Sequence, residues 1–528
     1  MNDQAEGDNR LHAVARGGAL NMVGAVVYGA TQFLLLAVVA NRLGAARAGE
    51  FLTVIVVFNI MSKFGELGSS TGLIRMISRA RAVGEERELR AFMTVGVVGP
   101  LLAGAALSGL LWTGAPTLAS WFGQGRDVDR ITEMLRIVAP FLPLASTYAV
   151  LWQGTRGFDT MVPQVVIEKV VKSSVQVVAV FIVTAAGGGV LAAIVTWAIV
   201  QVSALVAATV AAVRLLRRAE RHDARPRRAV DRQLATSFFA FSLPRALGQV
   251  FQVTILWFDT LLIGIILGTK EAGIYGAGTR YLLIGIFAAE AIMQVLGPQI
   301  SGLLAVRDRA RASELLGAAA AWQTAVVWPV YLLVLAFPAS LLSIFGDEFV
   351  AADDALRFLA VAMLVVAPFG PTDTVILMSG RSRQSLANTL VSVTVNVAGN
   401  LLLIRRYGIT AAGAVWAATI VITTLLPAWQ SARTLGVSPR GRARLVAAAA
   451  AAGAFAPAAL AGRLLGGDRI GVLAVVAGAG TGAYVWILRR YRREVQLDVL
   501  FSALRRQPTP RVLDSSTRRA GASSERIN

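Results

Sequence analysis

The sequence predicts an all-α polytopic membrane protein with about fourteen transmembrane helices, arranged as two pseudo-symmetric six-helix bundles followed by two C-terminal helices. Hydrophobic residues make up 55% of the 528 residues and charged residues only 16%, with a mean hydropathy of +0.62. Soluble domains are less apolar and more highly charged. Apolar stretches of about 20 residues, long enough to cross a bilayer as a helix, recur from residue 17 to residue 488. The bilayer is therefore the solvent in which this chain folds.

Charged or turn-forming stretches separate the apolar runs and delimit each expected span. The expected spans are residues 17–40, 50–74, 91–114, 131–154, 164–186, 190–213, 240–266, 273–303, 317–340, 355–378, 386–404, 411–431, 443–462 and 469–488. Loops that would share the side of both termini hold more than twice as many Lys and Arg as the opposite loops. Because basic loops stay in the cytoplasm, the asymmetry predicts that both termini are cytoplasmic.

The net charge of +20 and the absence of cysteine exclude several classes of function. The arginines lie between the apolar spans, where anionic lipid and topology account for them, so we expect no nucleic-acid partner. Without cysteine there are no disulfides and no thiolate metal sites. The acidic run at 347–354 sits where a helix N-terminus would favour negative charge, and we expect no metal there. No Gly-x-x-x-x-Gly-Lys phosphate loop is present, so we expect no ATP site and no cofactor.

The longest basic loop divides the chain into segments. Residues 1–213 are the expected N-terminal six-helix bundle, 214–239 a basic cytoplasmic linker, and 240–431 the second six-helix bundle. Residues 432–488 supply the two extra helices. The remainder, 489–528, is a basic tail rich in Arg, Ser and Pro that we expect to be partly disordered.

An internal repeat relates the two halves. LGAARAGEF at 43–51 matches LGTKEAGIY at 267–275 at an offset of 224, and both form the turn between a first and a second span. PTLASWFG at 116–123 also resembles PASLLSIFG at 338–346, again in an outer loop. Such self-similarity indicates two homologous bundles about a pseudo-two-fold axis, with a transport site at their interface.

Several motifs resemble those of the polysaccharide-export flippases. NVAGNLLLIRRYGITAAGAVWA, from Asn396 to Ala417, resembles their Asn-x-x-x-Asn and Gly-Ala signature, and NRLGAARAGEF at 41–51 with LGSSTGLIRMISR at 67–79 resembles their first two spans. The family is part of a superfamily that also holds multidrug and toxin extruders and lipid II flippases. The resemblance implies a V-shaped pair of bundles in a bacterial cell membrane. It also implies polyprenyl-pyrophosphate-linked oligosaccharide as the cargo, with polysaccharide polymerase and glycosyltransferases as candidate partners.

Few ionisable residues lie within the expected spans, and each is costly at membrane depth unless it faces a cavity or a partner. Lys63 and Glu66 lie three residues apart on one helix face, so they form either a local ion pair or part of the site. The offset of 224 maps Glu66 onto Glu290. Our hypothesis is that both carboxylates line the cavity, with Lys63, Arg75 and Arg245 binding the pyrophosphate.

Four further residues carry interpretations that the sequence leaves open. Asp259 and Arg280 lie at similar depths on neighbouring spans, as either a static ion pair or a gate that breaks when the cavity opens. Glu168 and Lys172 have the spacing of a helical ion pair.

Three functions are compatible with the sequence. The first is a flippase for a lipid-linked glycan, which is a transporter and not an enzyme. The second is a cation-coupled multidrug exporter, which basic Lys63, Arg75, Arg245 and Arg280 disfavour. The third is an integral-membrane glycosyltransferase or polymerase, which the short loops disfavour.

Overall fold

The computed structural model describes residues 2–123, 126–220, 228–491 and 494. The described residues form helices and connecting turns, with no β-strand among them. This agrees with the all-α class that the sequence predicts. Residues 221–227 of the expected linker and the tail beyond residue 494 lie outside the described residues.

The helices of the N-terminal half end with α7. They are α1 (Asn2–Gly65), α2 (Ser69–Ala82), η1 (Glu86–Glu88), α3 (Leu89–Phe122), α4 (Arg126–Val138), η2 (Ala139–Phe141), α5 (Leu142–Arg156), the π-helix η3 (Gln164–Lys172), α6 (Ser173–Ala185) and α7 (Val190–Glu220).

The C-terminal half begins with α8. Its elements are α8 (Arg232–Ile266), α9 (Thr269–Thr279), α10 (Leu282–Ala305), α11 (Arg309–Ala336), α12 (Pro338–Leu342), η4 (Ser343–Phe345), η5 (Asp347–Ala352), α13 (Asp353–Val366), η6 (Ala367–Phe369), α14 (Thr372–Met378), α15 (Ser382–Gln430), η7 (Ser431–Leu435), α16 (Ala443–Gly466) and α17 (Ile470–Arg490).

Glycines divide the two longest helices. The backbone of α1 is non-helical at Gly44, where φ is 81°, and that of α15 is non-helical at Gly408, where φ is 61°. Residues with a side chain rarely adopt such angles, so each helix bends and can supply two crossings. Among the described residues, eight helices are long and apolar enough to cross a bilayer, or nine if the bent pair α9 and α10 is one crossing. The bends make this arrangement consistent with about fourteen spans.

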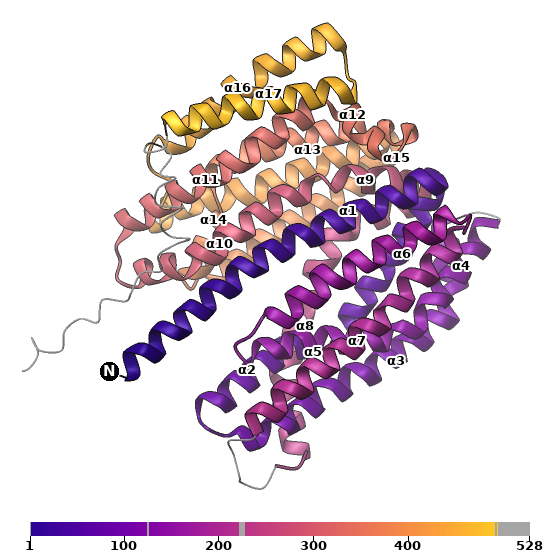
Figure 1. Cartoon of the computed structure of the whole chain (residues 1–528), viewed down its shortest axis with the longest axis vertical. Coiled ribbons are helices and arrows are strands. Elements are labelled where there is room, and N and C mark those ends of the chain that lie inside the picture. The colour runs from indigo at the N-terminus through magenta and orange to yellow at the C-terminus, as the bar shows by residue number, and fades with distance from the viewer. Residues whose placement is uncertain (1, 124–125, 221–227, 492–493, 495–528) are drawn as a thin grey trace, which may run out of the picture.

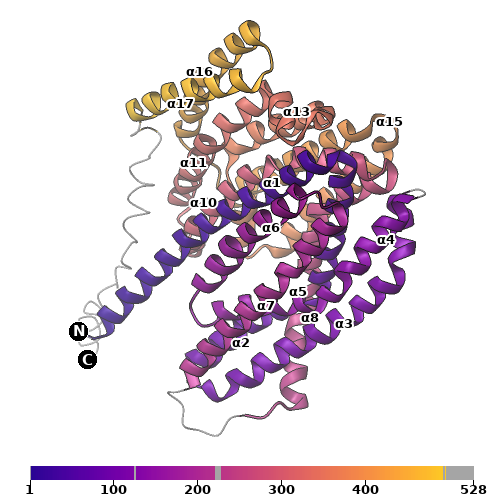
Figure 2. The same cartoon turned by 45° about the vertical axis from the view of Figure 1, so that its right-hand side comes forward.

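Figure 1 and Figure 2 show the two halves side by side, with α1 running between them. Helices α3, α4, α5 and α7 pack together in the N-terminal half, and α10, α11, α13 and α15 in the C-terminal half. The main contacts between the halves join α1 to α8 and α9, and α8 to α2 and α3. Helices α16 and α17 pack on α11 at the outside of the C-terminal half (Figure 2).

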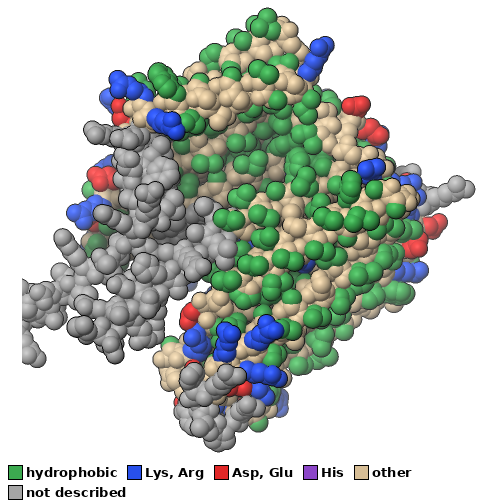
Figure 3. Space-filling model, viewed as in Figure 1, with side chains coloured by type: hydrophobic (Ala, Val, Ile, Leu, Met, Phe, Trp, Pro, Cys, Tyr) green, Lys and Arg blue, Asp and Glu red, His purple; other side chains and the backbone are tan. Residues whose placement is uncertain are grey.

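The surface matches a protein surrounded by lipid. Figure 3 shows hydrophobic side chains across the middle of one face, with Lys and Arg gathered towards its ends. Large apolar side chains such as Leu402 and Trp486 are more than two-thirds exposed. We call the end that carries η1 and residues 228–231 the linker end, and the end that carries Gly44 and Gly268 the turn end.

Candidate functional site

A break between α1 and α2 positions the first group of predicted site residues. The backbone takes positive φ at Leu67 and Gly68 before α2 begins. Across this break, Lys63 Nζ lies 3.1 and 3.0 Å from the two carboxylate oxygens of Glu66, and the Ser70 hydroxyl donates to the same carboxylate. Glu66 is buried, so its charge needs these partners. The structure therefore forms the local ion pair that was one of the two interpretations of Lys63 and Glu66.

The predicted arginines Arg75 and Arg245 come together from the two halves of the chain. The guanidinium carbon of Arg75, on α2, lies 4.0 Å from the centroid of the Phe241 ring, and that of Arg245, on α8, lies 4.4 Å from the same centroid. Both arginines are exposed. Neither forms an ion pair with a carboxylate in the part of the chain that the structure describes. Two positive charges, one from each half, thus share one ring, and neither has a carboxylate partner among the described residues.

Close packing of α2 on α8 produces this arrangement. A Cβ atom at Gly68 would lie 2.1 Å from the carbonyl oxygen of Ser242, so only glycine fits there. Gln249 Nε2 donates to the Thr71 hydroxyl across the same interface, at 2.6 Å. The contact between α2 and α8 therefore fixes the rotation of both helices, which sequence spacing alone does not give.

Glu290, the repeat equivalent of Glu66, belongs to α10. Its side chain lies outside the described residues.

The predicted gate pair of Asp259 with Arg280 is not formed in this structure. Asp259 is 3% exposed and instead accepts hydrogen bonds from Asn400, Asn396 and Tyr275, at 2.7, 3.4 and 3.5 Å. The guanidinium carbon of Arg280 lies 5.1 Å from the ring centroid of Trp257. Counting residues from a helix end gives depth but not the direction around the axis, and here the two side chains point to different neighbours.

The surroundings of Asp259 define what this cluster can do. Its donors are all neutral, and the side-chain oxygen of Asn400 has no hydrogen-bond partner among the described residues. A buried carboxylate without a cationic partner is costly, so the cluster favours a proton or a hard monovalent cation. The described residues contain no group of three His, Cys, Asp or Glu side chains that could hold a metal ion. Asn396 and Asn400 are the two asparagines of the Asn-x-x-x-Asn motif, to which the sequence assigned no individual role.

The predicted ion pair between Glu168 and Lys172 is also not formed. Lys172 is 8% exposed, and its Nζ lies 3.3 Å from the Tyr148 hydroxyl and 3.4 Å from Gln201 Oε1. Glu168 accepts a hydrogen bond from Gln164. Lys172 points into the interior of the N-terminal half, where the hydroxyl and the amide are its partners.

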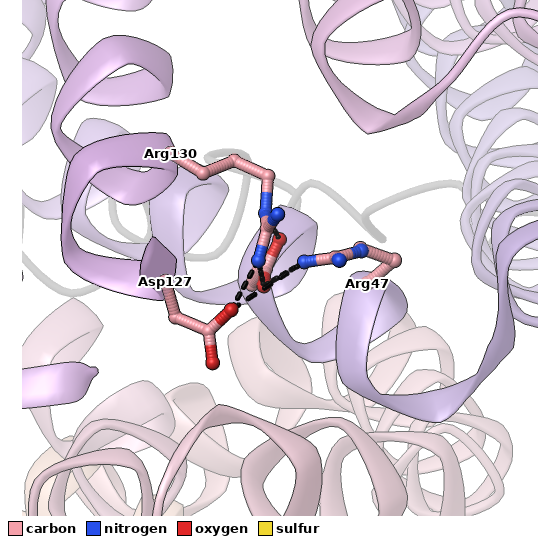
Figure 4. A network of polar contacts seen from close by, with 4 residues as sticks. Arg47, Asp127 and Arg130 are labelled. Atoms are coloured by element: carbon pink, nitrogen blue, oxygen red, sulfur yellow. Dashed lines mark hydrogen bonds and ion pairs between the residues drawn. The ribbon is translucent and has the colours of Figure 1, made fainter. Parts of the chain in front are cut away.

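A network at the turn end centres on Glu50, which the sequence analysis did not select. Glu50 is 1% exposed and receives Arg130 Nε at 2.9 Å and Arg47 Nη1 at 2.7 Å, while Arg130 also pairs with Asp127 (Figure 4). The network joins α1 to α4 within the N-terminal half. Arg47 and Arg130 therefore neutralise a buried carboxylate, in addition to contributing to the loop charge that predicts topology.

Comparisons with known proteins identify the family and the fold. A family model described as polysaccharide biosynthesis protein matches residues 14–304. The chain is 25% identical over 202 residues to a protein of Haloferax volcanii named "Probable low-salt glycan biosynthesis flippase Agl15". That match spans 37% of this chain and 41% of the relative's length, which is less than two thirds.

Two solved structures share the fold at low sequence identity. A lipid II flippase MurJ in an inward closed conformation superposes with a TM-score of 0.66 at 12% identity, over 89% of this chain and 99% of that one. An inward-facing multidrug resistance MATE family transporter gives a TM-score of 0.60 at 14% identity, over 78% of this chain and 94% of that one. These similarities confirm the predicted membrane-transporter fold.

The family match covers more than half of the chain and includes the segments that carry α2, the first part of α8 and the paired arginines. The chain is a multi-pass membrane protein that belongs to the polysaccharide biosynthesis protein family.

Proposed function

We propose that the protein is a flippase that moves a polyprenyl-pyrophosphate-linked oligosaccharide from the cytoplasmic to the outer leaflet. The observation that carries the proposal is the pair of exposed guanidinium groups on the Phe241 ring, one from each half of the chain. Two adjacent cations repel each other, and a diphosphate that accepts hydrogen bonds from both removes that repulsion. Such a bridge would also respond to any movement of α2 relative to α8.

The proposal includes the arrangement of the whole chain. Residues 1–213 and 240–431 are the two bundles, 214–239 the linker, 432–488 the accessory helices and 489–528 the tail. Both termini face the cytoplasm of a bacterial cell, so Arg75 and Arg245 receive cargo from the cytoplasmic leaflet. Lys63, Glu66 and Glu290 contribute to the same site, with Lys63 released from Glu66 when the diphosphate binds. Polymerase and glycosyltransferases supply and consume the cargo, and the protein itself carries out no bond-making step.

The proposed gate role of Asp259 and Arg280 belongs to another conformation. In the structure each has other partners. Asp259 and Arg280 would have to approach when the turn end opens for their ion pair to form.

Binding of a pyrophosphate lipid tests the proposal. We expect Arg75→Ala and Arg245→Ala each to weaken binding of polyprenyl pyrophosphate by the purified protein, because each removes charge-assisted hydrogen bonds of about 1.5 to 3 kcal/mol, or roughly 10- to 150-fold in Kd. Arg79→Ala is the matched control, since Arg79 is an exposed arginine one turn further along α2. Neutral polyprenol is the control ligand and should bind alike to all four proteins. Equal pyrophosphate affinity in the wild type and both variants would contradict the assignment.

The second candidate is a cation-coupled exporter of small molecules. The buried Asp259 with its neutral donors favours it, as does the fold shared with a multidrug transporter. Efflux of a cationic dye from vesicles, unaffected by Arg75→Ala but abolished by Asp259→Asn, would support this candidate over the flippase.

A further inference from the structure

The two halves of the chain touch through one very close helix crossing at the turn end. The second segment of α1 crosses α9 where Gly49 meets Gly273. A Cβ atom at Gly273 would lie 2.7 Å from both the Cα and the nitrogen of Gly49. A Cβ atom at Gly49 would lie 1.7 Å from the carbonyl oxygen of Thr269. Neither glycine has a positive φ, so close approach of the two backbones, and not a special backbone conformation, requires them.

The contact is reciprocal about the internal repeat. Gly49 and Gly273 occupy the same position of the two copies, and so do Ala45 and Thr269, at the offset of 224. Gly49 faces the carbonyl of Thr269, and a Cβ at Gly273 would lie 2.9 Å from the carbonyl oxygen of Ala45. Each half thus presents the same repeat positions to the other half, as a two-fold symmetric interface requires. The pseudo-two-fold axis therefore passes through this crossing.

Aromatic side chains extend the contact beside the crossing. The Phe33 ring of α1 lies 4.7 Å from that of Phe345 and 5.4 Å from that of Tyr281, centroid to centroid. Asn41 donates from its side chain to the carbonyl of Ile344, at 2.6 Å. These residues join the first segment of α1 to the C-terminal half.

Unlike these apolar contacts, the ion pairs at the turn end stay within one half of the chain. The Glu50 network stays within the N-terminal half, and the ion pair of Lys270 with Glu348, 2.8 Å long, stays within the C-terminal half. At this end, no ion pair between described residues joins one half to the other. Separating the halves at the turn end would therefore break dispersion contacts and one neutral hydrogen bond. Among the described residues it would leave no buried charge without its partner.

We propose that the crossing of Gly49 with Gly273, which lies on the pseudo-two-fold axis relating the two halves, is the reversible closure of the turn end. The glycines set how stable the closed state is, because any larger side chain at either position holds the helices apart. This inference deepens the proposed transport function. It rests on that function only where it assigns the movement to transport, because the closure itself is argued from helix packing. It assigns the closure to small residues and not to the predicted pair of Asp259 with Arg280.

Thiol labelling can report this closure directly, because the natural chain contains no cysteine. Leu52 is 2% exposed and packs against Gly276, one turn from the crossing, so Leu52→Cys introduces a smaller side chain that the closed state protects. Ala198→Cys, at a position fully buried in α7, reports general loosening of the fold. The labelling rate of each reporter is measured with a hydrophilic maleimide on the full-length protein in detergent.

We expect Gly273→Leu to raise the labelling rate of the Leu52→Cys reporter by about tenfold or more, since it shifts the population towards the open state. Gly49→Leu should have the same effect because of the symmetry. Gly109→Leu is the matched control, as nothing would lie within 4 Å of a Cβ there. It should leave the rate unchanged, and the Ala198→Cys reporter should be unaffected in all variants.

Two outcomes would overturn the inference. One is an unchanged rate at Leu52→Cys in a folded Gly273→Leu protein. The other is a parallel rise at Ala198→Cys, which would show a loosened fold in place of a shifted closure. Because the assay contains no lipid ligand, its result is independent of polyprenyl pyrophosphate binding. A positive labelling result with no difference in binding between the wild type and Arg75→Ala would retain the closure and reject the flippase assignment.

Discussion

Phe241 is the residue through which the paired arginines can be tested without removing a charge. Its ring lies within 4.0 and 4.4 Å of the two guanidinium carbons, well inside the range of cation–π attraction. At an exposed site each such contact contributes about 0.5 to 1 kcal/mol. Replacement by leucine keeps an apolar side chain between α2 and α8 but removes both contacts, which together amount to about 1 to 2 kcal/mol.

The loss should appear in ligand affinity because the ring preorganises the arginines. Without it, both side chains regain rotamer freedom and the diphosphate must order them on binding. We expect Phe241→Leu to weaken polyprenyl pyrophosphate binding by roughly 5- to 30-fold, with Arg75 and Arg245 still present. Phe241→Tyr keeps an aromatic face and should bind like the wild type.

Calorimetry or native mass spectrometry of the detergent-purified protein would measure the effect, with neutral polyprenol as the control ligand. Thermal unfolding of each variant would verify that the helices remain packed. Wild-type affinity in Phe241→Leu, together with a clear loss in Arg75→Ala, would show that the arginines bind independently and that the shared ring has no role.

Three further predictions concern stability. Glu50→Gln removes one charge from a buried group that pairs with two arginines, so we expect a loss of about 3 to 5 kcal/mol in stability and a lower Tm in detergent. An unchanged Tm would show that the charge of Glu50 does not stabilise the fold. Asp468 accepts from the backbone of Ala339 and Ser340 and pairs with Arg463, so Asp468→Asn should weaken the attachment of the loop between α16 and α17 to α12, and limited proteolysis of that loop should become faster than in the wild type. The Asp231 pKa is held below its ordinary value, first by the hydrogen bond from the Leu234 backbone N–H and then by the one from Arg228. Its contribution to stability is therefore present above the unfolded pKa, near about 4, and is lost as the pH falls through the lower folded value. Asp231→Asn should flatten this acid-side decline in Tm. Identical profiles of Tm against pH for both proteins would argue against a stabilising role of Asp231 as the N-cap of α8.

Hydropathy and charge were sufficient to predict the class of the fold. The length of each apolar run, the basic loops and the repeat at an offset of 224 are properties of the chain itself. They follow from the thickness of the bilayer and from the cost of placing polar groups in it, so they need no knowledge of packing. The bends at Gly44 and Gly408 fall in turns that the expected spans had already separated.

Individual side-chain partners needed the tertiary structure. The spacing of Lys63 and Glu66 allowed a local ion pair, and the structure forms it, because both lie within one short stretch of chain. The pairings of Asp259 with Arg280 and of Glu168 with Lys172 looked equally plausible by depth or spacing, yet neither is formed. Asp259 and Lys172 instead bind partners on helices that are distant in sequence, and Glu168 takes Gln164 of its own helix as its partner.

The chain by itself thus determined that the protein crosses the membrane many times as two related halves. Only the packed helices decided that Arg75 and Arg245 share the ring of Phe241, and that Gly49 meets Gly273 on the pseudo-two-fold axis. The physical reason is that hydrophobic length and charge count are additive along a sequence. The direction in which a side chain points depends on the rotation of its helix, and contacts with helices remote in sequence fix that rotation.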